Sequence, residues 1–190
     1  MTKVQYYCAA TLDGYIADPD DNLDWLLGYE GSYEGPEAEV ATMGEGGSYD
    51  RFYESVGAMI GGSTTYEWVL ENLDEWPYAG KPYWVLSTRD LPQPEAEGAD
   101  VRVVDAKVEE IHEEVIASAG ERNLWIIGGG NVASQYAAAG LIDELLLTVV
   151  PVVLGAGKPL FEKRLPAPLQ LKGTTVFRTG MVELRYEFGD

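Results

Sequence analysis

The amino-acid sequence predicts an α/β protein built around a mainly parallel sheet. Short apolar runs alternate with helix-like segments along most of the 190 residues, which is the pattern of strands joined by crossover helices. The apolar run at residues 124–127 leads into three glycines and a helical segment, and another apolar run follows at residues 144–150. Two late strand-like runs, 169–178 and 181–188, are joined by a short Thr-Gly link, which is typical of an antiparallel hairpin. A mixed sheet is therefore expected, with the late strands adding antiparallel pairing.

The remaining strands are expected where short apolar runs are rich in β-branched or aromatic residues. These runs comprise residues 3–10, 58–62, 83–87 and 101–104. The segment 11–24 contains Asp-Gly and Asp-Pro turn signals and is expected to be a polar loop. Residues 28–36 hold three glycines and a proline, so irregular structure is expected there.

Four helices are expected, at residues 37–54, 63–72, 107–119 and 131–139. The first is interrupted by three glycines near its middle. The second begins with hydroxyl residues, so Ser63 or Thr64 is the expected N-cap, and Glu67 stands where a capping box needs an acid. The third carries apolar residues at helical spacing, and Gly140 is the expected C′ residue of the fourth.

Composition is that of an ordinary globular domain. Hydrophobic residues make up 46% of the chain and charged residues 24%, and no evident linker divides residues 1–190, so a single domain is expected. No secretory signal and no apolar run of about 20 residues is evident, so a cytoplasmic protein is expected. The one cysteine, Cys8, cannot form a disulfide within the chain and is expected to be a buried thiol.

The net charge of −19, from 32 acidic and 13 basic residues, disfavours nucleic acids and membranes as partners. A small-molecule ligand is expected instead. An anionic ligand would have to bind against the overall field, so local N–H donors and a few cations would have to attract it. The scattered acids are otherwise interpreted as solvated faces that maintain solubility.

Three segments carry groups suited to phosphate binding. In residues 60–66, a strand ends in two glycines and a hydroxyl-rich helix start, although ordinary capping would explain the same residues. In residues 85–89, Arg89 follows a strand, either to grip a phosphate or as a solvated surface group. Glycines 128–130 join a strand to a helix, either to admit a phosphate to backbone N–H groups or to allow tight packing.

Several other sites are disfavoured by their residues. The glycine run is not the G-x-G-x-x-G fingerprint of a Rossmann dehydrogenase, because Ala133 fills the third place. Asp18 begins a segment similar to an EF-hand loop, but Leu23 and Tyr29 replace the required glycine and glutamate. One histidine and one cysteine cannot build a zinc site of the deaminase type, so no metal is expected.

The three segments occur in chain order with Thr11-Leu-Asp-Gly-Tyr-Ile-Ala17, with Asp24-Trp25 and with Pro151-x-x-Leu-Gly-x-Gly-x-Pro-Leu-Phe161. Together they resemble the dihydrofolate-reductase-like family, and specifically the branch similar to the C-terminal reductase domain of the bacterial riboflavin biosynthesis protein RibD. The resemblance covers nearly the whole chain. It implies a three-layer fold with a central, mixed but mostly parallel eight-stranded sheet flanked by helices, and NADPH as the hydride donor.

The resemblance also implies which residues contact the coenzyme. Ala9 and Ile16 are expected at the nicotinamide carboxamide, through backbone groups. The diphosphate, ribose and 2′-phosphate regions are expected to lie against Gly62, Ser63, Thr64, Thr65, Gly128, Gly129, Gly130, Asn131, Val132 and Gln135, and the adenosine with its 2′-phosphate against Ser87, Thr88 and Arg89. Many relatives carry arginine where Ser63 stands. Arg89 is therefore the main candidate for the 2′-phosphate, and the choice between NADPH and NADH stays open.

Hydride transfer also requires a proton donor and a pocket that excludes water. True dihydrofolate reductases place a carboxylate after the Trp-containing loop. By that analogy Asp24 and Glu30 are the candidate donors, with a surface position as the alternative for each. Four aromatic residues are expected either to wall a pocket for a flat ring or to pack in the core: Trp25, Tyr49, Phe52 and Tyr66.

The sequence thus predicts an NADPH-dependent reductase of the RibD C-terminal type, similar to 5-amino-6-(5-phosphoribosylamino)uracil reductase, or a reductase of a similar small heterocycle. A genuine dihydrofolate reductase is the second enzyme hypothesis. A well-placed pocket carboxylate would favour it, whereas an aromatic-lined pocket without one would favour the RibD type. A non-catalytic NADP-binding module is the alternative of a different class. Relatives of this kind commonly form homodimers, and the apolar late strands could supply an interface, so a homodimer is expected.

Overall fold

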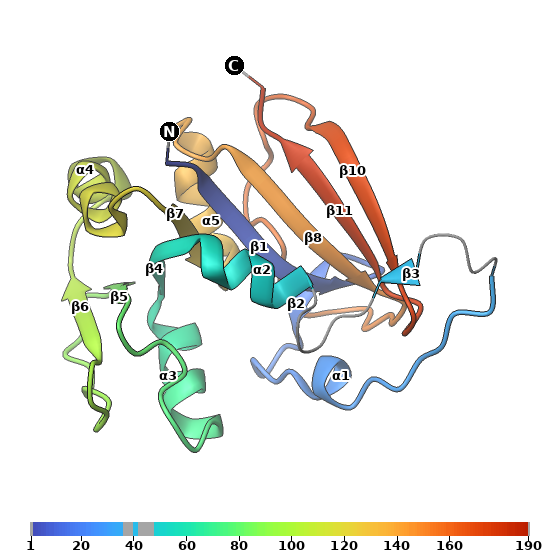
Figure 1. Ribbon diagram of the computed structural model, residues 1–190, viewed down its shortest axis with the longest axis horizontal. Helices are drawn as coiled ribbons and strands as arrows, with labels where there is room; N and C mark the ends of the chain where they lie inside the picture. The colour runs from blue at the N-terminus through green and yellow to red at the C-terminus, as the bar shows by residue number, and fades with distance from the viewer. Residues whose placement is uncertain (1, 36–39, 42–47, 190) are drawn as a thin grey trace.

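The computed structural model describes residues 2–35, 40–41 and 48–189, and the strands in these ranges form two sheets (Figure 1). The main sheet contains β1 (Val4–Thr11), β3 (Val40–Ala41), β4 (Val56–Gly62), β5 (Pro82–Leu86), β6 (Asp100–Val104), β7 (Asn123–Ile127), β8 (Glu144–Val150), β10 (Gln170–Phe177) and β11 (Val182–Glu187). Their order across the sheet is β3-β10-β11-β8-β1-β7-β4-β5-β6. Two short strands, β2 (Tyr15–Ala17) and β9 (Lys158–Pro159), form a separate antiparallel pair.

The mixed, mostly parallel sheet that the sequence predicts is confirmed. Strands β1, β4, β5, β6, β7 and β8 pair in parallel, whereas β11 pairs antiparallel with β8 and with β10. All eight predicted strands are present, and the last two form the predicted hairpin. The two-residue strand β3 adds to this set and pairs with the end of β10.

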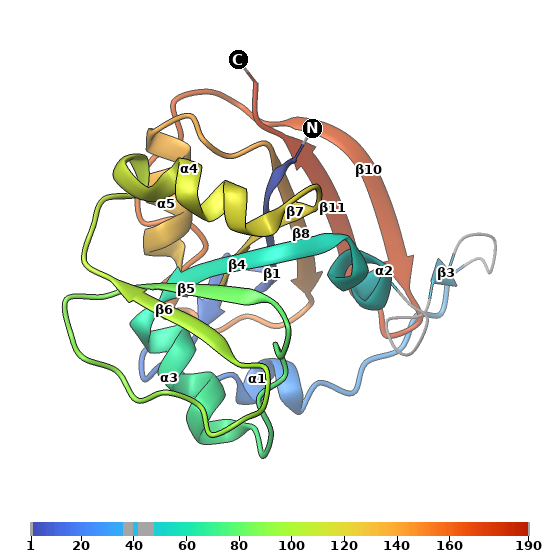
Figure 2. The same ribbon diagram turned by 60° about the vertical axis from the view of Figure 1, so that its left-hand side comes forward.

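Helices cover both faces of the sheet and give three layers (Figure 2). On one face lie α4 (Val108–Ala119) and α5 (Gly130–Ala138), and on the other lie α2 (Ser48–Ser55) and α3 (Ser63–Asn72). The single turn α1 (Asp24–Leu27) packs near the end of β8. None of the helices in the described ranges has the length and apolar character needed to cross a membrane.

The central strands are apolar on both sides because both faces of the sheet are covered. Successive side chains of a strand point to opposite faces. Tyr6 therefore packs in the core with α4 and α5, and Tyr7 packs in the core with α2 and α3. In β7, Ile126 likewise packs in the core with α4 and α5, and Trp125 packs in the core with α2 and α3. This double burial explains why the sequence shows continuous apolar runs rather than alternation.

The prediction of a helix over residues 37–54 is wrong at residues 40–41 and is confirmed for residues 48–54. Helix α2 begins only at Ser48, and residues 40–41 are in strand β3. The other residues of the predicted first half, 37–39 and 42–47, lie outside the described part of the chain. The glycine-rich composition of that half opposes a helix, because glycine loses more backbone entropy there than any other residue.

Helix α3 has the predicted bounds, but its predicted cap is wrong. The N-cap is Gly62, and no side chain makes a capping hydrogen bond, so neither Ser63 nor Thr64 has that role. Glu67 does not complete a capping box, because its carboxylate binds Arg89 instead. The first N–H groups of α3 are thus left without a side-chain partner.

An ion cluster around one buried carboxylate joins the amino ends of β1 and β8 to β11. The Glu144 side chain is fully buried, and its carboxylate accepts hydrogen bonds from Lys3 Nζ and an Arg185 terminal nitrogen at 2.5 Å each, and from Gln5 Nε2 at 2.6 Å. Burial alone would raise the pKa of Glu144, but the hydrogen bonds from Arg185, Lys3 and Gln5 outweigh it and the pKa is lowered. The cluster therefore stabilises the fold when Glu144 is ionised.

Replacement of Glu144 by glutamine should lower the free energy of unfolding at neutral pH by about 2 kcal/mol, because Lys3 and Arg185 lose a buried charged partner. Urea unfolding measures this loss. In the unmodified protein the stabilisation should be complete above the usual glutamate pKa of 4.5 and should disappear as the pH falls through the lower folded-state pKa. Glu144→Gln should lack that pH dependence.

The control is Asp100→Asn, which removes an exposed ion pair with Arg102 on β6. It should cost less than about 1 kcal/mol, as exposed pairs usually do. Equal losses in the two variants would contradict a special contribution from the cluster around Glu144.

Candidate functional site

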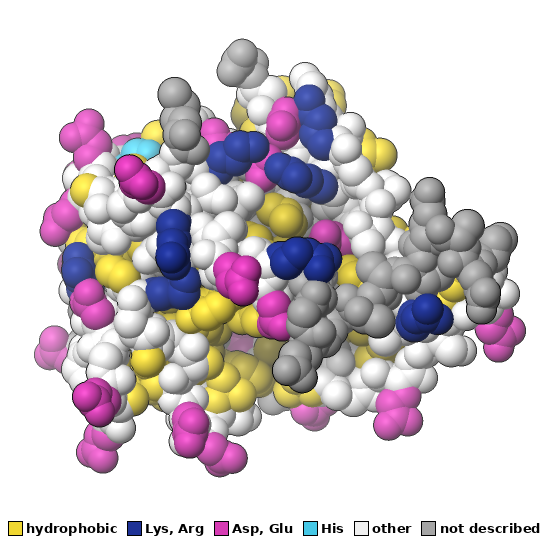
Figure 3. All heavy atoms as spheres, viewed as in Figure 1, with side chains coloured by type: hydrophobic (Ala, Val, Ile, Leu, Met, Phe, Trp, Pro, Cys, Tyr) yellow, Lys and Arg dark blue, Asp and Glu magenta, His cyan; other side chains and the backbone are white. Residues whose placement is uncertain are grey.

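A cavity of about 830 Å³ opens at the carboxyl ends of the parallel strands. The ends of β1, β4 and β7 line it together with α1, the β2–β9 pair and the first turns of α3 and α5. In the space-filling view, apolar side chains gather around a hollow in the lower middle, whereas most acidic side chains lie around the outline (Figure 3). Open α/β sheets bind ligands at this edge, and the volume falls within the range of about 300–1,000 Å³ of ligand pockets.

Two helices begin at this cavity without side-chain caps. Helix α3 starts after Gly62 and helix α5 after Gly129, and glycine has no side chain that could cap. Residues 63–65 and 130–132, which form the two first turns, line the cavity. The first N–H groups of a helix lack partners within it, and the helix dipole is positive at this end. The two termini together therefore form a site suited to phosphate.

Glycines 128–130, at the junction of β7 and α5, are required there for different structural reasons. Gly128 and Gly130 allow close packing, because a Cβ atom would lie 2.5 Å from Thr65 Oγ1 at the first position and 2.2 Å from the Pro159 carbonyl oxygen at the second. Gly129 has a φ of +70°, and a Cβ atom there would meet nothing within 4 Å. Packing thus explains two of the glycines, and the third leaves open backbone in the cavity wall.

A second cavity, of about 340 Å³, adjoins the first and shares Ser63 with it. Residues 87–89, which follow β5, line this cavity. The guanidinium of Arg89 is already paired, since its terminal nitrogens lie 3.0 and 2.6 Å from the two carboxylate oxygens of Glu67. One of these nitrogens also lies 3.0 Å from Ser63 Oγ. Arg89 is therefore held at the boundary between the two cavities.

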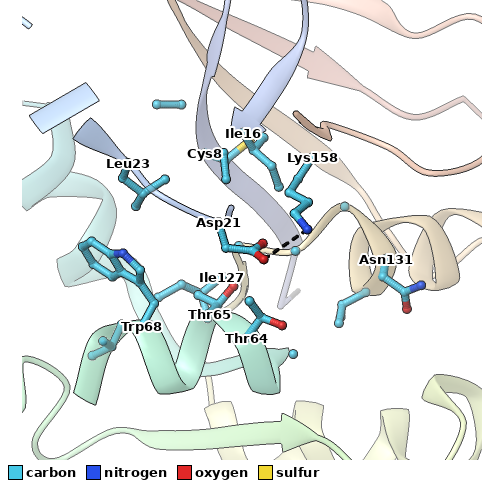
Figure 4. A pocket seen from close by; sticks show the side chains of 18 of the residues that line it. Cys8, Ile16, Asp21, Leu23, Thr64, Thr65, Trp68, Ile127, Asn131 and Lys158 are labelled. Carbon is cyan, nitrogen blue, oxygen red and sulfur yellow. Dashed lines mark ion pairs between the residues drawn. The ribbon is translucent and has the colours of Figure 1, made fainter. Parts of the chain in front are cut away.

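Another ion pair crosses the main cavity. Lys158, on β9, lies 3.1 Å from the Asp21 carboxylate, in the loop after β2 (Figure 4). Asp21 has a φ of +64°, and it is the only non-glycine residue in the described ranges with a positive φ. The Asp18 carboxylate holds this loop by accepting the N–H of Asn22, and this hydrogen bond is the largest cause of its lowered pKa. The loop thus presents Asp21 to the cavity in a strained conformation.

The other part of the cavity is apolar and aromatic. Tyr7, Tyr49 and Trp125 line it together with the leucines of α1. The Trp125 indole N–H donates to the Tyr7 carbonyl oxygen at 3.0 Å, which fixes this wall. Burial raises the pKa of Tyr7 to about 12, with a smaller contribution from Glu183, and burial also raises the pKa of Cys8 to about 12. Both groups are therefore neutral at physiological pH, and the thiol is not an activated nucleophile.

Every residue of the predicted coenzyme set lines one of the two cavities. The adjoining cavity is lined by Ser87, Thr88 and Arg89. The main cavity is lined by Ala9, Ile16, Gly62, Ser63, Thr64, Thr65, Gly128, Gly129, Gly130, Asn131, Val132 and Gln135. The fold thus brings together residues from five separate parts of the sequence. Their individual contacts with a coenzyme stay a prediction.

Of the four aromatic residues expected at the pocket, Tyr49 lines the cavity and the other three do not. Phe52 is buried and stacks on a neighbouring tyrosine, with ring centroids 4.4 Å apart. Tyr66 is fully buried, and its hydroxyl donates to a backbone carbonyl at 2.5 Å. Trp25, a residue of α1, is partly buried and packs against a small core of Val150, Phe177 and Met181. Core packing is therefore the correct interpretation of these three residues.

The candidate proton donors Asp24 and Glu30 are exposed, and neither lines the cavity. Helix α1 is a single turn whose leucines line the cavity, so the exposed Asp24 at its start is not part of the wall. The carboxylates in the lining are Asp21 and Glu162 instead, and Glu162 accepts a hydrogen bond of 2.6 Å from the Asn131 amide. Within the described ranges, no group of three or more His, Cys, Asp or Glu could hold a metal ion.

Asp21, Lys158 and Trp68 also line the cavity, although the sequence did not predict them there. Trp68 could have been found, because it lies four residues after Thr64 and hence on the same face of α3. Lys158 stands within the glycine-rich motif that supports the family resemblance. No local signal connects it with Asp21, since the two are far apart in the sequence and meet only through the β2–β9 pair.

Comparison with known proteins agrees with this geometry. The family model of the RibD C-terminal domain matches residues 75–182. A Bacillus subtilis (strain 168) protein, "Uncharacterized protein YwjB", is 35% identical over 97% of each chain. A solved structure from Shewanella sp. PV-4, described as a "Putative riboflavin biosynthesis protein", is 28% identical over the whole of both chains, with a TM-score of 0.77.

A dihydrofolate reductase from Enterococcus faecalis, complexed with NADP(H), is 18% identical over 99% of this chain and 97% of its own, with a TM-score of 0.58. At that identity the likeness shows the fold alone. The chain therefore belongs to the RibD C-terminal domain family and has the dihydrofolate-reductase-like fold.

Proposed function

We propose that this protein is an NADPH-dependent reductase of a small heterocyclic substrate. The observation that carries the proposal is that two uncapped helix N-termini meet at one cavity whose other part is apolar and aromatic. The helix termini suit the phosphates of a dinucleotide. The aromatic part suits two flat rings that must lie face to face for hydride transfer. The similar fold of a dihydrofolate reductase that is complexed with NADP(H) supports the same coenzyme.

The residues of the two cavities fit this coenzyme. Residues 63–65 and 130–132 offer backbone N–H groups to the diphosphate, and Gly129 leaves room for its approach. Arg89 and its neighbours would hold the 2′-phosphate in the adjoining cavity. Ala9 would hold the nicotinamide carboxamide through its backbone, together with Ile16. When bound, NADPH supplies the hydride.

The chain itself would contribute orientation and the exclusion of water. Tyr7, Tyr49 and Trp125 form a wall whose packing and hydrogen bond hold it in place. Such a wall can keep the reacting carbons about 3–3.5 Å apart and remove water that would compete for the hydride acceptor. A proton must follow the hydride. Asp24 and Glu30 lie outside the cavity, so we assign this role to neither.

The substrate class is supported by the shape and charge of the site. A carboxylate in the aromatic part would favour a pterin such as dihydrofolate. The lining carboxylates, Asp21 and Glu162, pair instead with Lys158 and Asn131. We therefore favour 5-amino-6-(5-phosphoribosylamino)uracil, whose charged sugar phosphate could use a cation, and the riboflavin-related description of the Shewanella protein supports the same class.

A coupled binding and activity measurement tests this proposal. Calorimetry should show NADPH binding with a micromolar dissociation constant, and NADPH absorbance should fall when 5-amino-6-(5-phosphoribosylamino)uracil is added. Turnover of dihydrofolate instead would support a genuine dihydrofolate reductase. Binding without turnover of either substrate would support a non-catalytic module. If neither NADPH nor NADH binds at millimolar concentration, the proposed function is wrong.

Replacement of Gly129 by alanine should weaken NADPH binding by about tenfold or more, since the new Cβ atom enters the space through which a phosphate would approach the backbone. The variant must also adopt a positive φ, which costs about 1–2 kcal/mol of stability. Calorimetry measures the first effect and urea unfolding the second.

The matched control is Gly140→Ala. Gly140 has a φ of +66°, a Cβ atom there would meet nothing within 4 Å, and it takes the predicted C′ position at the far end of α5. Its alanine variant should lose similar stability and bind NADPH as the unmodified protein does. Equal losses of affinity in both variants would show that strain alone is responsible and that Gly129 does not contact the coenzyme.

A further inference from the structure

An acidic and a basic residue that favour opposite coenzymes are paired at the adjoining cavity: Arg89 lines it, and Glu67 binds Arg89 from α3 without lining it. In dinucleotide sites an acidic residue at the ribose hydrogen-bonds the 2′-hydroxyl of NADH, whereas an arginine there accommodates the 2′-phosphate of NADPH. Here Glu67 and Arg89 bind each other through two hydrogen bonds of 3.0 and 2.6 Å. Ser63 lines both cavities, and its hydroxyl oxygen accepts a hydrogen bond from Arg89.

The elements of the fold hold these groups in place. Glu67 lies one turn along α3 from Ser63, so both side chains project from the same side of the helix. Arg89 follows β5, the strand next to β4, and its backbone N–H donates to Ser87 Oγ at 3.0 Å. The guanidinium is thus directed back onto α3, where the first turn is uncapped. A 2′-phosphate that reached Arg89 would meet the Glu67 carboxylate as a competitor of the same charge.

We propose that Glu67 is a specificity-determining residue, which lowers the preference for NADPH by holding the Arg89 guanidinium that a 2′-phosphate would need. This inference rests on the proposed function. The pair is partly exposed, with side chains 56% and 31% exposed, so the ion pair is weak enough for a phosphate to replace the carboxylate. Glu67 therefore tunes the choice of coenzyme and does not block either one.

Opposite shifts in the two charge-removing variants test the proposal. Calorimetry with NADPH and NADH gives the ratio of their affinities in each protein. Glu67→Gln should raise the ratio in favour of NADPH by about two- to fivefold, because the competing charge is gone. Arg89→Gln should lower the same ratio by about tenfold, because the 2′-phosphate loses its charged partner. Should Arg89→Gln fail to fold in a urea-unfolding check, Arg89→Lys, which lacks the paired donors, should lower the ratio in the same direction.

Two matched variants separate this local effect from the general field of the protein. Glu71→Gln removes the same charge one turn further along α3, on an exposed residue, and should leave both affinities unchanged within about twofold. Asp21→Asn frees Lys158 in the main cavity, and asparagine tolerates a positive φ. It should tighten both coenzymes by the same factor, because Lys158 lies away from Arg89 and its cavity.

The outcomes distinguish the inference from the proposed function. If the unmodified protein binds neither coenzyme, the proposed function fails and this inference fails with it. If both coenzymes bind but Glu67→Gln leaves their ratio unchanged, or shifts it toward NADH, the inference alone is wrong. A shift in Glu71→Gln as large as that in Glu67→Gln would also overturn it, because the effect would then come from net charge.

Discussion

The site depends on backbone N–H groups at two helix starts that no side chain caps, at one edge of the sheet. Gly62 and Gly129 begin α3 and α5 without a side-chain cap, so the positive ends of two helices face the same cavity. Unpaired buried donors are costly unless water or a ligand satisfies them. In a chain with a net charge of −19, such local donors can attract an anion that the overall field repels. The two lining cations do not replace them, because carboxylates already hold both.

The other edge of the sheet, at the amino ends of β1 and β8, has a different chemistry. There, the buried Glu144 carboxylate binds the partly exposed Lys3 and Arg185 and so ties β1, β8 and β11 together. The carboxyl ends hold glycines, hydroxyls and a cavity. Stability and binding are thus divided between the two edges of one sheet. The double covering of the strands makes this division possible, because the apolar interior of the sheet fixes both edges relative to each other.

Much of the fold could be predicted because its signals are local. Apolar runs predict the central strands, the hairpin pattern predicts the last two, and α3 begins and ends at the predicted residues. The expected N-caps of α3, Ser63 or Thr64, are wrong because the N-cap is Gly62, which has no side chain to bond the first N–H groups. The aromatic wall was only partly predictable, since burial in a core and burial around a pocket select the same residue types: Phe52 and Tyr66 pack in the core, whereas Trp125 and Tyr49 line the cavity. The ion pairs of Asp21 and Glu67 depend on tertiary contacts, which the spacing of residues along the sequence does not predict.

Backbone amide chemical shifts during titration with NADPH test the central claim most directly, because they report on the N–H groups themselves. The largest changes should occur at the amides of residues 63–65 and 130–132, with smaller changes at residues 87–89. Saturable changes confined to other parts of the chain, with these first-turn amides unaffected, would show that the uncapped helix termini do not bind the dinucleotide.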